Sequence, residues 1–284
     1  MRKTTRIWII VAAALVASGF VLFVAVMSAN HWDFSRLNTG KYETTIHEIS
    51  EDFSSLSVKT ETADIAFAIS EDGSCKVACY ENEKEKYSVA VQDDTLVIKR
   101  MGKRNWFGYI GISISSPRIT VYLPKTEYNS FHIETDTGNI QLEDISVNSL
   151  ALLTDTGKMT VSGVTCSEDV SVDTSTGNVN LRDTTCENVL SEGNTANIVL
   201  ENVIATGKFS IETDTGNVRL ESCDAAEIYV ETDTGNVSGT LLSDKVFITE
   251  TDIGCVDVPK SITGGRCEIF TDTGNIKIDV TPQM

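Results

Sequence analysis

Apolar residues recur in pairs, two positions apart, on either side of a repeated Thr-Asp-Thr-Gly-Asn motif in residues 131–284. Counted from the glycine position of each motif, positions −7, −5, +2 and +4 are apolar in all eight copies, except at Ser191, Gly239 and Thr249. A spacing of two residues is typical of β-strands, whose alternate side chains point to the same side. Each copy therefore predicts two short strands that flank a corner and direct their apolar side chains into a common interior.

The motif returns at a nearly constant interval. Its glycine position falls at residues 138, 157, 177, 196, 216, 235, 254 and 274, with alanine at 196, so the spacing is 19 or 20 residues. A fixed period of this size indicates a solenoid in which each repeat forms one coil. We therefore predict an all-β, single-stranded parallel β-helix (β-solenoid) with eight regular coils of about 19–20 residues over 131–284. Glycine is expected to supply a left-handed corner, and the neighbouring Asp or Asn to cap it.

Residues 51–130 show the same alternation without the corner motif. The segment 56–67 matches the repeat, with Ala63 at the glycine position, and predicts a degenerate first coil. Further strands are predicted over 77–79, 87–91, 96–98 and 119–123. We interpret 51–130 as an irregular β region that caps or continues the solenoid, because a bare end coil would expose its core. Little chain follows the eighth repeat, so that coil is expected to form the exposed far end.

The N-terminal segment predicts a membrane-spanning helix. Residues 7–27, from Ile7 to Met27, carry no charge, and a helix of this length spans about 31 Å, close to the hydrocarbon thickness of a bilayer. The basic residues of the 1–6 tail favour a cytoplasmic N-terminus, which places the rest of the chain outside after a juxtamembrane stalk over 28–50. The alternative is a signal peptide cleaved after residue 28 or 29, which would release a secreted protein.

The charge is concentrated in the repeats. The net charge is −18, and residues 131–284 alone hold 8 basic and 26 acidic residues, which also gives 8 − 26 = −18. An acidic rod of this kind repels nucleic acid, so no nucleic-acid partner is predicted.

Aspartate occupies the same place in six of the eight motifs. Stacked coils would bring these carboxylates to within about 5 Å of one another, where they repel unless they accept hydrogen bonds or are bridged by cations. One interpretation is a row of turn-capping carboxylates. The other is a row of calcium sites, although one carboxylate per coil falls short of the six to eight oxygens that calcium prefers. The residues of this aspartate ladder are Asp136, Asp155, Asp214, Asp233, Asp252 and Asp272.

A basic and aromatic segment over 99–109 stands out in this acidic chain. It could contact anionic lipid head groups, a wall polymer or a partner protein, or its rings could pack over the end of the rod. The residues of this candidate interaction loop are Lys99, Arg100, Lys103, Arg104, Trp106, Phe107 and Tyr109.

Cysteine and histidine predict no metal or cofactor site. The three histidines do not form a ligand-spaced cluster with the seven cysteines. Cys166 and Cys186 follow their glycine positions by the same nine residues, so they should stack about 4.8 Å apart and could form a disulfide. Cys75 and Cys79 could pair across a local bend, or the thiols could simply be small buried groups.

Several of these features together resemble a known family. They are the apolar N-terminal segment, the Phe-Ser-Ser-Leu-Ser-Val start at 53–58, the Leu123-Pro124 pair and the recurring corners. They resemble the bacterial "putative adhesin" family of β-strand-repeat proteins, over about residues 50–284. The resemblance implies β-helices at bacterial cell surfaces, some linked to envelope-stress systems, and a domain of unknown function without catalytic residues.

We therefore predict a membrane-tethered, extracytoplasmic, non-catalytic surface protein that serves adhesion or sensing at the cell envelope. Its partner would be a protein or a cell-wall polymer. An alternative is a structural rod that assembles end to end. A polysaccharide-active β-helix enzyme is a further alternative, but such an enzyme needs a unique, differently tuned pair of carboxylates, and the acids here repeat.

Overall fold

The N-terminal helix α1 comprises Lys3–Ala29 in a computed structural model that describes residues 3–29, 31–32, 42–82, 85–102 and 116–281. Within it, Thr5–Ala29 is long and apolar enough to cross a membrane. A membrane anchor and a signal sequence both satisfy this criterion, so both predictions for the N-terminus are compatible with the helix.

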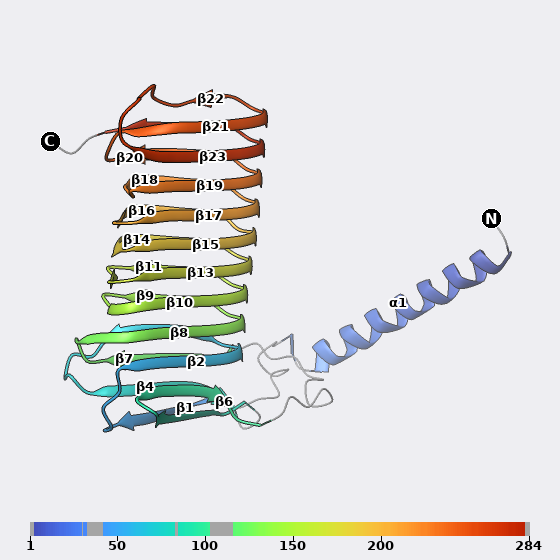
Figure 1. Ribbon diagram of the computed structural model, residues 1–284. Helices are drawn as coiled ribbons and strands as arrows, with labels where there is room; N and C mark the ends of the chain where they lie inside the picture. The colour runs from blue at the N-terminus through green and yellow to red at the C-terminus, as the bar shows by residue number, and fades with distance from the viewer. Residues whose placement is uncertain (1–2, 30, 33–41, 83–84, 103–115, 282–284) are drawn as a thin grey trace. The chain divides into compact units, whose positions relative to one another are not determined.

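The rest of the described chain is almost entirely β-structure (Figure 1). Each repeat places one strand before its corner and a second strand, of equal or shorter length, after it. The strands before the corners are β8 (Glu127–Thr137), β10 (Ser146–Thr156), β13 (Asp169–Thr176), β15 (Asn188–Thr195), β17 (Lys208–Thr215), β19 (Glu227–Thr234), β21 (Lys245–Ile253) and β23 (Gly265–Thr273). Those after the corners are β9 (Ile140–Glu143), β11 (Met159–Ser162), β14 (Val179–Cys186), β16 (Ile198–Ala205), β18 (Val218–Cys223), β20 (Val237–Leu241), β22 (Val256–Asp257) and β24 (Ile276–Val280), with a short β12 (Thr165–Cys166) between.

Equivalent strands of neighbouring repeats pair in parallel and in register. Leu150 of β10, for example, pairs with Phe131 of β8 on one side and Val170 of β13 on the other. The stack is an open, solenoid-like arrangement, and its apolar ladders form one continuous core. The apolar positions read from the sequence line this interior as predicted, except in the seventh repeat, where Val256 is 44 % exposed.

The coils of the last two repeats are stacked out of chain order. β19 of the sixth repeat pairs with β23 of the eighth, and β23 in turn pairs with β21 of the seventh. Figure 1 shows β23 between β19 and β21. The prediction that the eighth coil ends the stack is therefore wrong: the chain adds the seventh coil at the end and then returns to fill the place beneath it.

The N-terminal region adjoins the first regular repeat directly. β2 (Ser55–Thr62) and β3 (Asp64–Ile69) form a coil that pairs in parallel with β8 and β9, and Leu56 lies opposite Phe131. This confirms the degenerate first coil predicted from the sequence. The remaining strands are β1 (Tyr42–Ile49), β4 (Cys75–Asn82), β5 (Tyr87–Gln92), β6 (Thr95–Arg100) and β7 (Arg118–Leu123).

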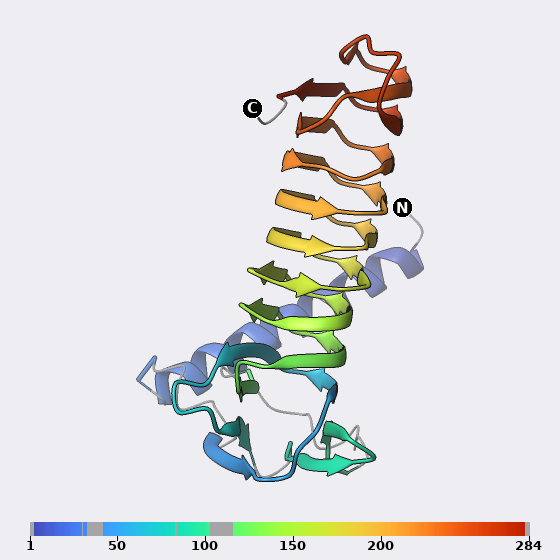
Figure 2. The same ribbon diagram turned by 60° about the vertical axis from the view of Figure 1, so that its left-hand side comes forward.

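Antiparallel pairing distinguishes this region from the repeats. β5 pairs with β6, and β4 with β7, in antiparallel register (Figures 1 and 2). β1 pairs with β4, so residues 42–49 belong to the β-structure. The predicted stalk over 28–50 is therefore too long at its C-terminal end, because the alternation in the Tyr42–Ile49 segment was missed.

The corner glycines allow the backbones of adjacent coils to approach closely. This corrects the expectation from the sequence that they supply a left-handed backbone conformation. Gly157, Gly177 and Gly235 do not adopt left-handed backbone angles. A Cβ atom on Gly177 would lie 1.8 Å from the carbonyl oxygen of Gly157 in the adjacent coil. A side chain at Gly177 would therefore force these coils apart, and Ala196 holds the same position in the fourth repeat beside Gly193, which has no side chain.

The left-handed residue lies at a second corner, six residues after the glycine position. Its backbone φ is positive at Asp144 (56°), Gly163 (65°), Asp183 (47°), Asn202 (54°) and Ser222 (53°). Asp, Asn and Gly tolerate this conformation best. Their recurrence at this position is a sequence signal for the second corner.

Candidate interaction surfaces

The aspartate ladder lies on the outside of the first corner, with every carboxylate exposed. Because of the changed coil order, Asp272 stands between Asp233 and Asp252. Within the described part of the chain, five of the six form no hydrogen bond or ion pair, and Asp136 has an interaction. The residues without such a contact are Asp155, Asp214, Asp233, Asp252 and Asp272.

Asparagine caps the corner instead of aspartate. Asn217 Oδ1 accepts a hydrogen bond from the backbone N–H of Asn236 in the next coil (2.9 Å), and Asn236 Oδ1 accepts one from Asn275 (2.8 Å). The side-chain amides also bond to one another, as from Asn236 Nδ2 to Asn217 Oδ1 (3.1 Å). The interpretation of the aspartates as turn caps is therefore wrong for the five that make no contact, because the neighbouring amides occupy that role.

The aspartate ladder does not gather its carboxylates into a cluster of ligands within the described residues. Among the residues that the structure describes, no group of three or more His, Cys, Asp or Glu side chains is placed to hold a metal ion. One exposed carboxylate per coil offers too few converging oxygens for calcium.

A second row of carboxylates runs beside the aspartate ladder. Asp173, Glu192, Glu212 and Glu231 stand in direct register on β13, β15, β17 and β19, and all are exposed. We call these four residues, together with Asp214 and Asp233, the acidic face. Among the described residues, Glu231 is the member of this set that has a side-chain hydrogen-bond partner, the hydroxyl of Tyr229.

The outer surface of the strands after the corner differs in charge balance. Arg182 pairs with Glu201 (2.7 Å), and Arg219 pairs with Glu221. These ion pairs neutralise acids on the strands after the corners, whereas the carboxylates of the acidic face form no ion pair within the described residues.

The candidate interaction loop is only partly within the described residues. Lys103, Arg104, Trp106, Phe107 and Tyr109 lie outside them. Lys99 and Arg100 end strand β6, and Lys99 is exposed. Arg100 forms an ion pair with Glu61 (2.5 Å), and its side chain is only 11 % exposed, so this arginine holds β6 against the first coil.

The seventh coil presents an apolar end to the stack. β21 and β22 pair with β23 and β24 on one side only, so their outer edges carry unpaired backbone groups. The exposed fractions of Ile253 and Ile262 are 69 % and 95 %. The predicted interior position Thr249 belongs to this coil and is half-buried.

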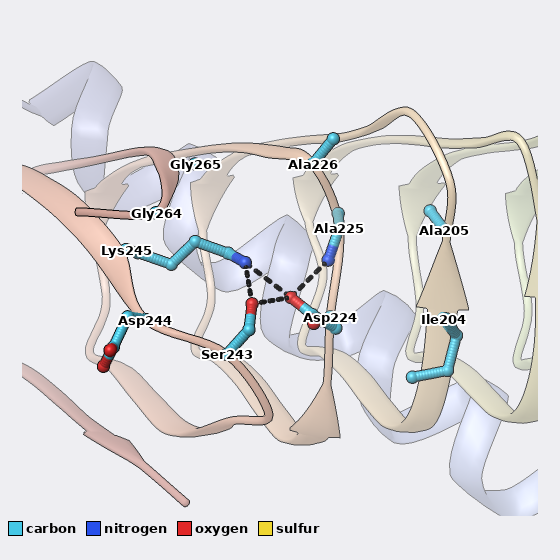
Figure 3. A pocket seen from close by; sticks show the side chains of 10 residues that line it. All are labelled: Ile204, Ala205, Asp224, Ala225, Ala226, Ser243, Asp244, Lys245, Gly264 and Gly265. Carbon is cyan, nitrogen blue, oxygen red and sulfur yellow. Dashed lines mark hydrogen bonds and ion pairs between the residues drawn. The ribbon is translucent and has the colours of Figure 1, made fainter. Parts of the chain in front are cut away.

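A pocket lies where the coil order changes, and it contains a buried charged cluster (Figure 3). Lys245 Nζ lies 2.5 Å from Asp224 Oδ1 and 2.5 Å from Ser243 Oγ. Ser243 Oγ donates to the same Asp224 oxygen (2.9 Å), as does the backbone N–H of Ala225 (3.0 Å). The lysine side chain is 3 % exposed and that of Asp224 is 26 % exposed.

Sequence reasoning missed this cluster because its members lie at different repeat positions. The sequence feature that could have indicated the cluster is Gly265, which pairs with Lys245. A Cβ on Gly265 would lie 1.9 Å from the carbonyl oxygen of Ala226, and the lysine Cδ is 3.6 Å away. The glycine thus leaves room for the lysine to reach back past the eighth repeat to Asp224.

All seven cysteines are free thiols, and only Cys255 is exposed. Cys75 and Cys79 lie four residues apart on the same strand, β4, which separates them by about 13 Å and excludes the predicted pairing. Cys166 and Cys186 do occupy neighbouring coils, since Thr165 pairs with Thr185. Burial raises the pKa of the Cys186 thiol to about 12.

The repeats and their corner motif define a class of β-strand-repeat proteins with a solenoid-like fold. The Toastrack DUF4097 family model matches residues 53–283, so the chain belongs to this family. A search of curated proteins gives no match.

Two solved structures are similar to this chain to different degrees. A "putative adhesin" from Bacteroides fragilis is 15 % identical with a TM-score of 0.51, and the match covers 85 % of this chain and 97 % of that one. A "putative lipid binding protein" from Parabacteroides distasonis is 16 % identical with a TM-score of 0.42, and the match covers 86 % and 96 %. At this identity, the first match supports the fold alone.

Proposed function

We propose that this chain is a membrane-tethered, extracytoplasmic surface protein that binds partners without catalysis. The observation that carries the proposal is the acidic face, which displays carboxylates in register along successive coils. The interior of the repeats is filled by apolar ladders, so only outward side chains are free to contact a partner. The description of a structural neighbour as an adhesin is consistent with this role.

The finer architecture is part of the same proposal. We take the body as a single-stranded parallel β-helix whose final two coils exchange places. The coils keep a nearly constant length, and the described residues show repeated rather than unique acids, which supports a display surface over a polysaccharide-cleaving groove.

The partner surface would be cationic, either a basic protein segment or a positively charged wall polymer, because the acidic face carries uncompensated negative charge. The test is sedimentation of the purified full chain with native envelope fractions. Replacing Glu192, Glu212 and Glu231 with Gln should abolish salt-sensitive binding. A matched variant with Gln at Glu143, Glu201 and Glu221, on the strands after the corners, should bind normally. Equal binding by both variants would refute the acidic face as the contact surface.

Membrane tethering through α1 is tested separately. An uncleaved anchor predicts a chain that keeps its N-terminal residues and stays in the membrane fraction after alkaline extraction. A mature protein that begins after residue 28 or 29 and appears in the medium would refute the tether.

End-to-end assembly is a second candidate function, favoured by the unpaired edge of β21 and the exposed apolar residues around it. Paired edges would bury Ile248 and Ile253, which are 42 % and 69 % exposed. Assembly predicts a concentration-dependent sedimentation coefficient that an Ile253→Lys variant loses. A chain that stays monomeric at every concentration would remove this candidate.

A further inference from the structure

We propose that Lys245 and Asp224 condense to form an isopeptide bond that fastens the out-of-order end of the stack. This is a covalent modification, and it does not depend on the proposed function. It rests on the burial of the lysine, the bridging serine and the position of the pair where the coil order changes.

Burial makes the ionic form of Lys245 and Asp224 energetically costly. The Lys245 side chain is 3 % exposed, and a charge removed from water loses hydration that Asp224 and Ser243 restore only in part. An amide carries no net charge, so its formation removes this cost. The same exclusion of water from the lysine nitrogen disfavours the reverse hydrolysis.

The arrangement supplies a path for the proton that must move first. Lys245 Nζ donates to Ser243 Oγ (2.5 Å), and Ser243 Oγ donates to Asp224 Oδ1 (2.9 Å). A concerted shift along these two bonds converts the ammonium and carboxylate into a neutral amine and a carboxylic acid. Lysine becomes a nucleophile only in this neutral form.

The condensation then balances without another reactant. The Nζ lone pair attacks Asp224 Cγ, the new C–N bond forms and one C–O bond breaks. The departing oxygen takes the acid proton and one amine proton and leaves as water. The N–H of Ala225, 3.0 Å from Oδ1, withdraws electron density from the carboxyl group during the attack.

The location gives the bond a structural purpose. Asp224 follows β18 of the fifth repeat, whereas Lys245 begins β21 of the seventh. The seventh coil is held by pairing on one side only and is the least secured regular coil. A covalent link would keep it closed over the eighth coil, which the chain adds afterwards.

Lys76 and Asp72 provide an internal control. Their ion pair is equally close (2.6 Å) and also involves serine hydroxyls, from Ser70 and Ser74. Here the lysine side chain is 35 % and the aspartate 58 % exposed, so water stabilises the charges. This pair should remain ionic.

The test is a tryptic map of the full-length chain, purified, denatured and alkylated. Trypsin does not cleave after an acylated lysine, so the linked protein should yield residues 220–260 as one peptide, lighter by one water. Cleavage after Lys76 should proceed normally, and both lysines are followed by valine, which matches the two sites. Cleavage after Lys245 of the wild-type chain would overturn the proposal. This holds even if the peptide 220–245 is lighter by one water, because such a peptide contains a dehydrated aspartate and no link to the lysine.

Three variants test the chemistry. Lys245→Arg should give no linked peptide, since guanidinium is not a nucleophile at neutral pH. Asp224→Asn should give none either, because its amide cannot accept the proton that the lysine must lose, and a linked peptide in this variant would refute proton transfer to the carboxylate. Ser243→Ala should slow the appearance of the linked peptide in freshly made protein. Linkage at the wild-type rate in Ser243→Ala would refute the proton path, and linkage in Lys245→Arg would refute the lysine as the linked residue.

Discussion

Replacing a corner glycine with alanine should separate two coils, and Gly235 shows why. A Cβ at this position would lie 1.8 Å from the carbonyl oxygen of Gly216 and 2.6 Å from its carbon. Real Cβ contacts are not shorter than 3.0 Å, so the corners must move apart by at least 3.0 − 1.8 = 1.2 Å. Both contacts are with backbone, so no side-chain rotation can relieve them.

The size of the effect follows from the bonds that this movement stretches. Between the same two coils, Gly216 N–H donates to Thr234 O (3.0 Å) and Val218 N–H to Asn236 O (2.9 Å). Asn236 N–H donates to Asn217 Oδ1 (2.9 Å). An additional 1.2 Å would break all three, at about 1 kcal/mol each. Lower chain entropy in the unfolded alanine variant offsets about 0.4–1 kcal/mol, which leaves a net loss of about 2–3 kcal/mol.

The assay is urea unfolding of the full chain in detergent, followed by circular dichroism of the β-structure. Asp233→Ala is the matched control from the same corner, because its exposed side chain makes no contact within the described residues. It should change the free energy of unfolding by less than about 0.5 kcal/mol, and relief of carboxylate repulsion favours a small gain. If Gly235→Ala and Asp233→Ala unfold at the same urea concentration, close approach is not the reason for the glycine.

Three further predictions follow from the packing. In hydrogen exchange, the amides of β23 should be protected and many of those of β21 should exchange quickly, although β21 precedes β23 in the chain; the reverse order would contradict the exchanged coils. The free energy of unfolding should fall above about pH 9, because thiols such as Cys186 ionise in the unfolded chain but stay protonated in the folded protein, where the pKa of this thiol is about 12. Each such thiol lowers the free energy of unfolding by up to about 1.4 kcal/mol per pH unit. Equal urea midpoints at about pH 8 and about pH 10 would contradict this prediction. Gly193→Thr should destabilise the fold, because a Cβ at residue 193 would lie 2.7 Å from the Cβ of Ala196. Adding Ala196→Gly should restore stability, because the double variant recreates the regular corner. A double variant that is no more stable than Gly193→Thr alone would refute this compensation.

The fourth repeat shows how far the pattern could be interpreted without a structure. Its departure from the motif marks it as a place to look for function. In the structure, Gly193 takes the place of the motif's first threonine and Ala196 takes the place of its glycine. The alanine methyl therefore fills space that the threonine fills in other repeats. What stays unusual is the buried Ser191 hydroxyl, which has no hydrogen-bond partner within the described residues.

Candidate sites were less predictable than the fold, because a repeat position specifies burial but not partners. The exposure of the aspartate ladder follows from its place at the corner, yet only the structure shows that asparagine makes the capping bonds. Arg100 lies in a basic segment, but its partner Glu61 is brought there by pairing of β2 with β6. The cluster around Lys245 depends on contacts between three repeats, which periodicity does not reveal.

The sequence by itself determined the strands, the coil length, the interior positions and the apolar N-terminal helix. These are local properties, because alternation and period act over a few residues of chain. The tertiary structure decided the order of the final coils, since the repeat period alone allows either the seventh or the eighth repeat to pair with the sixth. In the observed order, Asn275 of the eighth repeat bonds to Asn236 of the sixth, and Lys245 reaches Asp224 past Gly265. Such side-chain contacts exist only when distant repeats are already stacked.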